Sequence, residues 1–282
     1  MPAIANMKGL TRIVKSGQYE FPVVVAGEGP AVLLLHGFPD SRLMWRFQVP
    51  ALTQAGFTVI APDLRGFGEA PRPEGKENYL MPLILADLNG ILDTLSTESV
   101  SVIAHDWGAG AAWMYAAFFP ERVERLAALS VGCPWTSGWT TFEQREASWY
   151  ILFFQWAGIA EARLMENDWE LFKGWMRGRG DVDLVLEQIQ RPGALTAALN
   201  WYRANAELRM PAEDPPNPAP IACPVMGLWS DGDVYLTEGQ MLSTPEALSG
   251  DWRYEKIEGA SHWMMLEKSE QTNELLIDFL KS

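Results

Sequence analysis

The sequence predicts an α/β protein with a mostly parallel central sheet, helices on both of its faces, and a helical segment inserted into the chain. Three observations lead to this fold class. Strand and helix patterns alternate over the first 130 residues, the alternation stops at about residue 134, and it resumes at about residue 221. Such alternation is typical of a parallel sheet with helical crossovers. We therefore expect a core domain of residues 1–133 and 221–282, and a helical cap of residues 134–220.

The strands of the first part are expected where short apolar, β-branched runs end in turn residues. The segment FPVVVAGEGPAVLLLHG holds two such runs with a glycine-rich turn between them. Three more runs are FTVIAPD, SVSVIAHD and VERLAALSVG. Helices are expected from the apolar spacing of NYLMPLILADLNGILDTL and from the alanine-rich WGAGAAWMYAAFFP, which ends at Pro120. These elements supply the alternation on which the fold class depends.

The inserted segment differs in composition from the core. Between residues 134 and 210 the pattern is helical without a convincing strand, and seven tryptophans fall there: Trp135, Trp139, Trp149, Trp156, Trp169, Trp175 and Trp201. These rings predict a packed helical layer, an aromatic wall around an apolar ligand, or both. The proline-rich MPAEDPPNPAPIACP then predicts a connector. The core resumes with the strand VMGLWSDGD, a helix near 237–248, the strand WRYEKIEG and a terminal helix.

Composition excludes several classes of function. The formal net charge of −14 disfavours binding to nucleic acid or to an anionic lipid surface. No run of 18 apolar residues predicts a membrane span, and MPAIANMKGL does not resemble a signal peptide. Only Cys133 and Cys223 are present, both in apolar surroundings. We therefore expect reduced thiols in a cytoplasmic protein rather than a disulfide framework.

Each of the three histidines, His36, His105 and His262, directly follows a predicted strand. Open α/β sheets bind ligands beyond the carboxyl ends of their strands, so three histidines at strand ends favour a functional site there. The first motif is LLLHGFPDS, in which Gly37 permits a sharp turn. We expect this turn to aim the backbone N–H of Phe38 at an oxyanion.

The second motif, Ala104-His105-Asp106-Trp107-Gly108, lies between a predicted strand and a predicted helix. This is the small-x-nucleophile-x-small pattern of a nucleophile elbow, with Asp106 in the place of the nucleophile. A helix N-terminus also stabilises an ionised carboxylate there. The alternative is that Asp106 only caps the helix.

The third motif, KIEGASHWMML, places His262 after the penultimate strand pattern. A catalytic histidine belongs there in the chain order nucleophile, acid, histidine. The acid is expected one strand earlier, where GLWSDGDVYL offers both Asp231 and Asp233. Spacing alone leaves these two alternatives open.

With these motifs, the sequence resembles the α/β-hydrolase-fold epoxide hydrolases of the soluble, bacterial and plant type, over nearly the whole chain. The segments that carry the resemblance are HGFPDS, PDLRGFGEAPRP, HDWGAGAAW, FFPERVERLAALS, NWYRAN, SDGDVYLTEGQM and GASHWMMLEKSEQTNELLIDFL. The resemblance implies that Asp106 is the nucleophile and that Asp233, rather than Asp231, pairs with His262. It further implies two cap tyrosines that activate the epoxide, Tyr202 in NWYR and Tyr150 before LFFQWAGIAEARL.

The resemblance also implies a mechanism and its participants. Asp106 would open a small apolar epoxide to give an alkyl ester, and a water activated by His262 would hydrolyse that ester. The backbone amides of Phe38 and Trp107 would form the oxyanion hole, and His36 and Pro39 would border the substrate. No metal and no organic cofactor is expected. The protein would be a monomer or a homodimer.

Four other interpretations share parts of this pattern. A haloalkane dehalogenase uses the same nucleophile and histidine, but generally has Asn where this chain has Phe38. A haloacetate dehalogenase is expected to have arginine where Trp107 stands, and a serine esterase needs serine in place of Asp106. A non-catalytic small-molecule receptor of the same fold is expected to have lost at least one of the catalytic positions. The sequence therefore favours epoxide hydrolysis.

Overall fold

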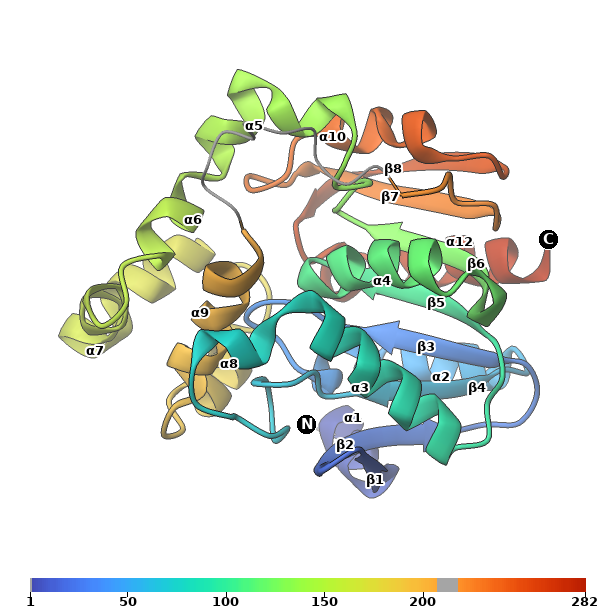
Figure 1. The fold of residues 1–282 in the computed structure, drawn as a ribbon, viewed down its shortest axis with the longest axis horizontal. Helices are drawn as coiled ribbons and strands as arrows, with labels where there is room; N and C mark the ends of the chain where they lie inside the picture. The colour runs from blue at the N-terminus through green and yellow to red at the C-terminus, as the bar shows by residue number, and fades with distance from the viewer. Residues whose placement is uncertain (1, 207–217) are drawn as a thin grey trace.

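The computed structural model describes residues 2–206 and 218–282. A single sheet of eight strands runs through this part of the chain (Figure 1). Its strands are β1 (Thr11–Ser16), β2 (Tyr19–Ala26), β3 (Ala31–Leu35), β4 (Thr58–Pro62), β5 (Val100–His105), β6 (Val123–Leu129), β7 (Val225–Gly232) and β8 (Trp252–Ser261). Their spatial order is β1-β2-β4-β3-β5-β6-β7-β8. This architecture confirms the predicted α/β class.

The sheet is antiparallel at one edge and parallel elsewhere. The β1–β2 and β2–β4 pairs are antiparallel, and every later pair from β4 through β8 is parallel. At its centre, Leu33 of β3 lies opposite Ile60 of β4 on one side and Val102 of β5 on the other. Because the parallel strands point the same way, the residues that follow β3, β5, β7 and β8 gather at one edge of the sheet.

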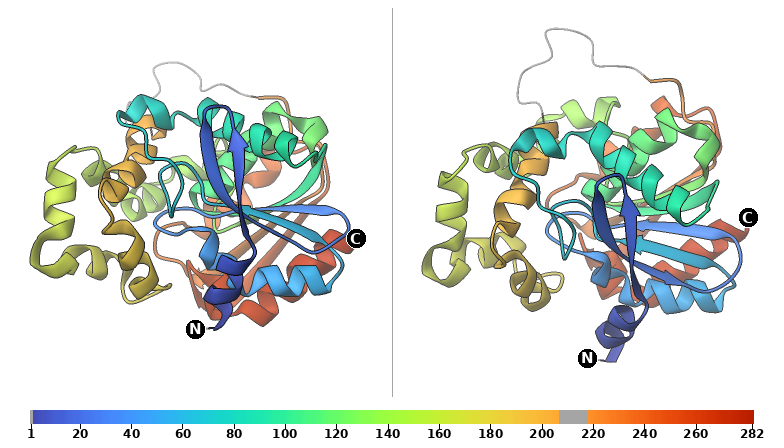
Figure 2. Two further views of the ribbon diagram at one scale, coloured as in Figure 1. Left: turned by 90° about the horizontal axis from the view of Figure 1, so that it is seen from below. Right: turned by 60° about the horizontal axis from the view of Figure 1, so that its bottom comes forward.

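Helices cover both faces of the sheet, as Figures 1 and 2 show. The α-helices of the core are α1 (Pro2–Gly9), α2 (Gln48–Gln54), α3 (Met81–Thr94), α4 (Trp107–Phe118), α10 (Glu238–Leu242), α11 (Met264–Glu267) and α12 (Ser269–Lys281). Short 3₁₀ turns are η1 (Arg42–Arg46), η2 (Lys76–Tyr79), η3 (Pro120–Arg122), η4 (Ser137–Thr140) and η5 (Thr244–Ala247). Helices α3 and α4 lie on one face, and α2 and α12 lie on the other. Strands covered on both sides read as continuous apolar runs, which is the pattern of β3 and β5.

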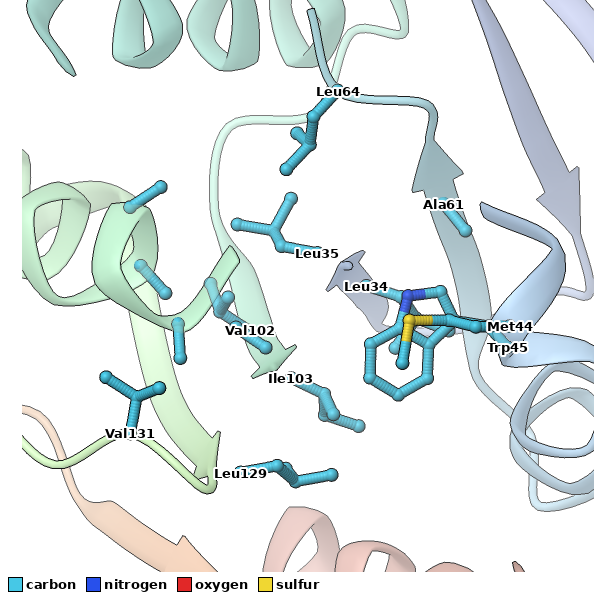
Figure 3. Close-up of a cluster of buried hydrophobic side chains, with 14 of the residues drawn as sticks. Leu34, Leu35, Met44, Trp45, Ala61, Leu64, Val102, Ile103, Leu129 and Val131 are labelled. Atoms are coloured by element: carbon cyan, nitrogen blue, oxygen red, sulfur yellow. The ribbon is translucent and has the colours of Figure 1, made fainter. Parts of the chain in front are cut away.

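The main hydrophobic core lies between the sheet and these helices. Figure 3 shows part of it, where Leu34 and Ile103 from the central strands lie near Met44 and Trp45 of η1. The side chains of all four are buried. Burial of a large aliphatic or aromatic side chain contributes roughly 1.5–3 kcal/mol, so this core anchors the strand ends that carry the polar motifs.

The cap is helical, as predicted, within the described residues. It contains α5 (Phe142–Ala147), α6 (Trp149–Phe154), α7 (Ile159–Met176), α8 (Val182–Ile189) and α9 (Ala194–Asn205). Helix α7 is interrupted at Glu166–Trp169, where the backbone leaves helical geometry. These helices lie beyond the carboxyl ends of the parallel strands, to the left of the sheet in Figure 1. The exact division of the chain at residues 133/134 and 220/221 stays a prediction.

Some elements differ from the sequence-based expectation. The expected helix near 237–248 is split into α10 and η5, because Pro245 lies at the start of η5 and lacks the N–H that a continuous helix needs. Helices α1 and α2 and strand β1 were not predicted, since their short segments have weak apolar periodicity. The expected connector over residues 210–224 lies outside the described residues as far as residue 217.

Candidate active site

Asp106 lies at the tip of a sharp turn between β5 and α4. Its backbone has φ 53° and ψ −127°, a conformation that is rare for a residue with a side chain and is typical of a strained functional turn. The turn is possible because its neighbours are small. A Cβ atom on Gly108 would overlap the carbonyl oxygens of Leu35 and His36, and one on Gly37 would overlap the side chain of Asp106. The two glycines therefore permit the close approach of the β3 and β5 loops.

The two oxygens of the Asp106 carboxylate have different surroundings. Oδ1 accepts a hydrogen bond from the backbone N–H of Phe38 over 2.7 Å. Oδ2 lies 3.5 Å from Nε2 of His262. Burial raises the pKa of Asp106, but the hydrogen bond and the charge of His262 and the backbone N–H of Trp107 outweigh it. The pKa of Asp106 is therefore lowered, and the side chain is a carboxylate at neutral pH.

His262 is joined to Asp233, as the family resemblance implies. Nδ1 of His262 lies 2.7 Å from Oδ2 of Asp233, whose side chain is fully buried. The other oxygen of Asp233 accepts the backbone N–H groups of Tyr235 and Leu236, over 2.9 and 3.1 Å. Asp231 is exposed and accepts the backbone N–H of Gly259 instead. The geometry therefore pairs His262 with Asp233, and the role of Asp233 as the catalytic acid stays a prediction.

The two aspartates control the protonation of His262. Burial lowers the pKa of His262, but the charge of Asp233 and the hydrogen bonds to Asp106 and Asp233 raise it to about 10. The resting site is therefore an imidazolium between two carboxylates. If Asp106 became a neutral ester, one of the two raising charges would be lost and the pKa of His262 would fall. A neutral group at position 106 would thus make it easier for His262 to lose its proton.

The other two histidines are internal to the site and bond to the backbone. Nδ1 of His36 donates to the carbonyl of Gly37, over 3.1 Å, and Nε2 accepts the N–H of Leu64, over 3.0 Å. The ring is fully buried, and burial lowers its pKa to about 4. Both ring nitrogens therefore already have backbone partners, and the expected contact of His36 with the substrate stays a prediction. His36 holds the β3 and β4 loops together.

His105 directly precedes Asp106, and its ring packs against that of His262. Its Nε2 donates to the backbone carbonyl of His262 over 2.9 Å, and the two rings are 4.3 Å apart. Burial, reinforced by the charge of His262, lowers the pKa of His105 to about 3. The ring is therefore neutral and fixes the backbone of the loop that carries His262.

Pro39 follows a cis peptide bond and is buried. It borders a small crevice between the core and the cap, together with Phe67 of the core and Ile189 and Ala198 of the cap. This places Pro39 at the junction of core and cap. Its expected contact with the substrate stays a prediction.

Both candidate cap tyrosines lie against the loops of the core. Tyr150 of α6 and Tyr202 of α9 are 5% and 2% exposed, and their rings are 6.0 Å apart. The ring of Tyr202 lies 5.3 Å from that of Phe38 and 5.0 Å from that of Trp107. Burial, followed by the charge of Asp106, raises the pKa of both phenols well above the usual value. Both tyrosines therefore keep their protons at neutral pH and can donate hydrogen bonds.

The neighbours of Tyr202 in the NWYR motif anchor it to the rest of the protein. Nε1 of Trp201 donates to the carbonyl of Arg65 in the core, over 2.8 Å. Arg203 forms a bidentate ion pair with Glu161 at the start of α7, at 2.8 and 2.9 Å. The bidentate geometry is specific as well as strong. The tyrosine is therefore held between a contact to the core and a contact within the cap.

Sequence analysis missed two residues of this cluster, Tyr235 and Trp175. The ring of Tyr235 lies 5.3 Å from that of His262 and 5.7 Å from that of Tyr150. The indole of Trp175 lies 5.0 Å from Tyr235 and 5.5 Å from Tyr150. The available signal for Tyr235 was its place two residues after Asp233. Trp175 was one of seven cap tryptophans, and spacing did not single it out.

Three further observations on the described residues concern metal ligands, membrane spans and the cysteines. Within residues 2–206 and 218–282, no group of His, Cys, Asp and Glu side chains is arranged to hold a metal ion. No helix in the same part of the chain is long and apolar enough to cross a membrane. Cys133 and Cys223 are both free thiols.

Comparison with known proteins places this chain in a family. The family model of the α/β-hydrolase fold matches residues 30–269. The chain is 33% identical over 288 residues to the AB hydrolase superfamily protein YfhM of Bacillus subtilis, covering 98% of this chain and 96% of that protein. It is 32% identical over 314 residues to epoxide hydrolase A of Mycobacterium tuberculosis, with 95% and 96% coverage.

Solved structures agree with these relatives. Epoxide hydrolase A from Mycobacterium thermoresistibile superposes with a TM-score of 0.78 at 30% identity, covering 96% of this chain and 98% of that one. The epoxide hydrolase of Bacillus megaterium, solved with an inhibitor, shares the fold with a TM-score of 0.88 at 24% identity, and the coverage is 96% and 100%. The chain therefore belongs to the α/β-hydrolase family, in the group that contains the epoxide hydrolases.

Proposed function

We propose that this protein hydrolyses a small apolar epoxide to a vicinal diol, through a covalent ester on Asp106. One observation carries the proposal. The carboxylate of Asp106 lies between the N–H of Phe38 and the ring of His262, and two protonated tyrosines of the cap lie above it. A carboxylate nucleophile opposite phenolic acids suits a substrate that needs attack at carbon and protonation at oxygen in one step.

In the first step, Asp106 attacks a ring carbon of the epoxide. The C–O bond to that carbon breaks, and a new bond forms between the carbon and a carboxylate oxygen. Oδ1 is held by Phe38, so we assign the attack to Oδ2, the oxygen that lies 3.5 Å from Nε2 of His262. The departing alkoxide is a strong base, and a hydroxyl of Tyr150 or Tyr202 protonates it. The surrounding Phe and Trp rings favour an apolar substituent on the epoxide.

In the second step, water hydrolyses the ester. His262, which the loss of the Asp106 charge makes less basic, gives its proton to the tyrosinate and then accepts one from water. The hydroxide attacks the carboxyl carbon of Asp106, and the N–H groups of Phe38 and Trp107 stabilise the oxyanion. The tetrahedral intermediate expels the diol oxygen, which takes the proton that His262 accepted from water, and the remaining carboxyl proton then passes to His262. Asp106 returns to a carboxylate with one oxygen taken from water.

A single turnover in H₂¹⁸O tests this pathway. Excess enzyme is mixed with styrene oxide, and the diol and the peptide that contains Asp106 are analysed by mass spectrometry. We expect the first diol to carry only ¹⁶O and the peptide to gain one ¹⁸O. A first diol that carries ¹⁸O would mean that water attacks the epoxide directly, which would overturn the role of Asp106.

A parallel incubation tests the dehalogenase alternative. Release of bromide from 1-bromobutane without any diol from styrene oxide would overturn the proposal in favour of a haloalkane dehalogenase. Binding of styrene oxide without diol or alkylated protein would instead favour a receptor. Diol formation without bromide release supports epoxide hydrolysis, because the side chain of Phe38 offers no N–H donor for a halide.

A further inference from the structure

Tyr235 belongs to the core but is held by the cap. It lies in the loop between β7 and α10, two residues after Asp233. Its hydroxyl donates to the backbone carbonyl of Trp175 in α7 over 2.6 Å. Its own carbonyl accepts the side-chain amide of Gln144 in α5 over 3.0 Å. The side chain and the backbone of one core residue are thus tied to two different cap helices.

The hydrogen bond between Gln144 and this loop is reinforced two residues further along, at Thr237. The amide oxygen of Gln144 accepts the N–H of Thr237 over 2.8 Å and its hydroxyl over 3.0 Å. The side chain of Gln144 is almost completely buried. A buried amide with both ends hydrogen-bonded has one orientation only, so the loop and α5 are held in a fixed relation.

Tyr235 also contacts the His262–Asp233 pair. The backbone N–H of Tyr235 donates to Oδ1 of Asp233 over 2.9 Å, which orients that carboxylate toward His262. The ring of Tyr235 lies edge-to-face on the ring of His262, with 5.3 Å between centroids and 74° between planes. Neither contact uses the hydroxyl of Tyr235, so the loss of that hydroxyl leaves both contacts to the pair in place.

On its other side, Tyr235 contacts the first cap tyrosine. Its ring lies 5.7 Å from that of Tyr150, at 87°. The indole of Trp175 packs against both, at 5.0 and 5.5 Å. Hence Tyr235 is in direct contact with His262 below and with Tyr150 above, and its hydroxyl fixes it to the helix that carries Trp175.

We propose that Tyr235 is a positioning residue that sets the place of Tyr150 relative to Asp106 and His262. The proposal rests on the epoxide hydrolysis proposed above. Ring opening needs Asp106 and a tyrosine hydroxyl on opposite sides of the oxirane at once, so it depends on the distance between core and cap. Ester hydrolysis uses His262, Asp233 and water, all from the core side. Loss of the hydrogen bond between Tyr235 and Trp175 should therefore slow formation of the Asp106 ester and leave its hydrolysis unchanged.

The substitution Tyr235→Phe tests this division, because it keeps the ring on His262 and removes only the hydroxyl that bonds to Trp175. Rapid-quench mass spectrometry measures formation and decay of the Asp106 ester in a single turnover of styrene oxide. We expect formation to slow by about 10-fold, since a misplacement of about 1 Å can cost up to about 100-fold. Decay should stay within about 2-fold of wild type.

A matched control separates this effect from the loss of a buried hydroxyl in general. Tyr79 is also fully buried, and it donates its hydroxyl to a backbone carbonyl within its own segment of the core, that of Pro73, over 2.9 Å. Tyr79→Phe should leave both rate constants near those of wild type. Gln144→Leu removes the hydrogen bond from α5 to the backbone carbonyl of Tyr235 without changing the side chain of Tyr235, and it should reproduce the slow formation of the ester if Tyr235→Phe does not fold.

Double variants test whether Tyr235 acts through Tyr150. In a Tyr150→Phe background, Tyr235→Phe should slow ester formation by less than about 3-fold, because coupled residues are not additive. In a Tyr202→Phe background, the effect should remain about 10-fold. Equal effects in both backgrounds would overturn the assignment to Tyr150.

The remaining outcomes are equally distinct. If the wild-type enzyme forms no Asp106 ester from the epoxide, the proposed function itself fails. If the wild-type enzyme forms the ester and folded Tyr235→Phe forms it at the same rate, the positioning role fails while the function stands. If both steps slow equally, Tyr235 has a general structural role, and the proposal is overturned.

Discussion

The backbone N–H of Phe38 is hydrogen-bonded to Oδ1 of Asp106 over 2.7 Å. The donor expected to stabilise an oxyanion thus already binds the resting nucleophile. If Oδ2 forms the ester, Oδ1 becomes the ester carbonyl oxygen and is in place on its donor before water attacks. This arrangement would lower the reorganisation energy of ester hydrolysis, because the N–H dipole of Phe38 would not have to move.

Removal of the nucleophile should abolish turnover. For Asp106→Ala, we expect diol formation from styrene oxide to fall by at least about 10⁴-fold, as for other residues that carry the covalent step. Diol is measured by chromatography, and circular dichroism and the melting temperature control for folding. Turnover at the wild-type rate by a folded Asp106→Ala protein would contradict the covalent mechanism.

Removal of the base should trap the ester. In His262→Gln, Asp106 can still attack the epoxide, but no side chain remains to activate water. We expect the intact protein mass to rise by the mass of one epoxide and to stay there for many wild-type turnover times. An unmodified variant that still produces diol would show that another group activates water.

Asp231, near the end of β7, and Asp233, directly after it, provide a matched pair. Asp233→Asn removes the charge that orients His262 and should reduce turnover by roughly 10³–10⁴-fold, as the wrong tautomer does in related triads. Asp231→Asn lies at the surface two residues away and should change turnover by no more than about 2-fold. Steady-state kinetics on both variants measures the difference. The reverse order of effects would assign the acid to Asp231.

Loss of one tyrosine hydroxyl should reduce activity without abolishing it. Tyr202→Phe keeps the ring packed between Phe38 and Trp107, and Tyr150 remains as a second acid. We expect kcat/KM to fall by roughly 10- to 100-fold, and the Tyr150→Phe, Tyr202→Phe double variant to lose nearly all activity. A double variant as active as either single variant would mean that the tyrosines do not protonate the alkoxide.

The proton held by His262 should be visible in the pH dependence of stability. The Asp233 and Asp106 charges, acting against burial, raise the pKa of His262 to about 10 in the folded protein, whereas an unfolded histidine titrates at about 6.5. Its stabilising contribution is therefore complete below about pH 6.5 and is lost as the pH rises toward 10. The melting temperature of wild type relative to His262→Gln should fall between about pH 7 and pH 10. A pH-independent difference would show that the pKa of His262 is not raised.

The fold and the polar ends of the strands could be predicted from local patterns. The runs that became β3, β5 and β7 are mostly apolar, and the ends of β3, β5, β7 and β8 are directly followed by His36, Asp106, Asp233 and His262. Parallel strands bring their carboxyl ends to one edge, so sequence order sufficed to gather these residues. Short elements such as α1 and β1 lacked enough periodicity to be predicted, and their positions depend on packing against the rest of the sheet.

The sequence by itself determined which residue types stand at the strand ends, and hence a carboxylate where many hydrolases have a serine. Tertiary structure alone decided which partners they have. In the folded protein, His262 pairs with Asp233 and not with Asp231. The ring of His36 lies between backbone groups. Tyr235 lies between His262 and Tyr150. The physical reason is that strand periodicity is local in the chain, whereas burial and hydrogen-bond geometry depend on segments that are distant in the chain.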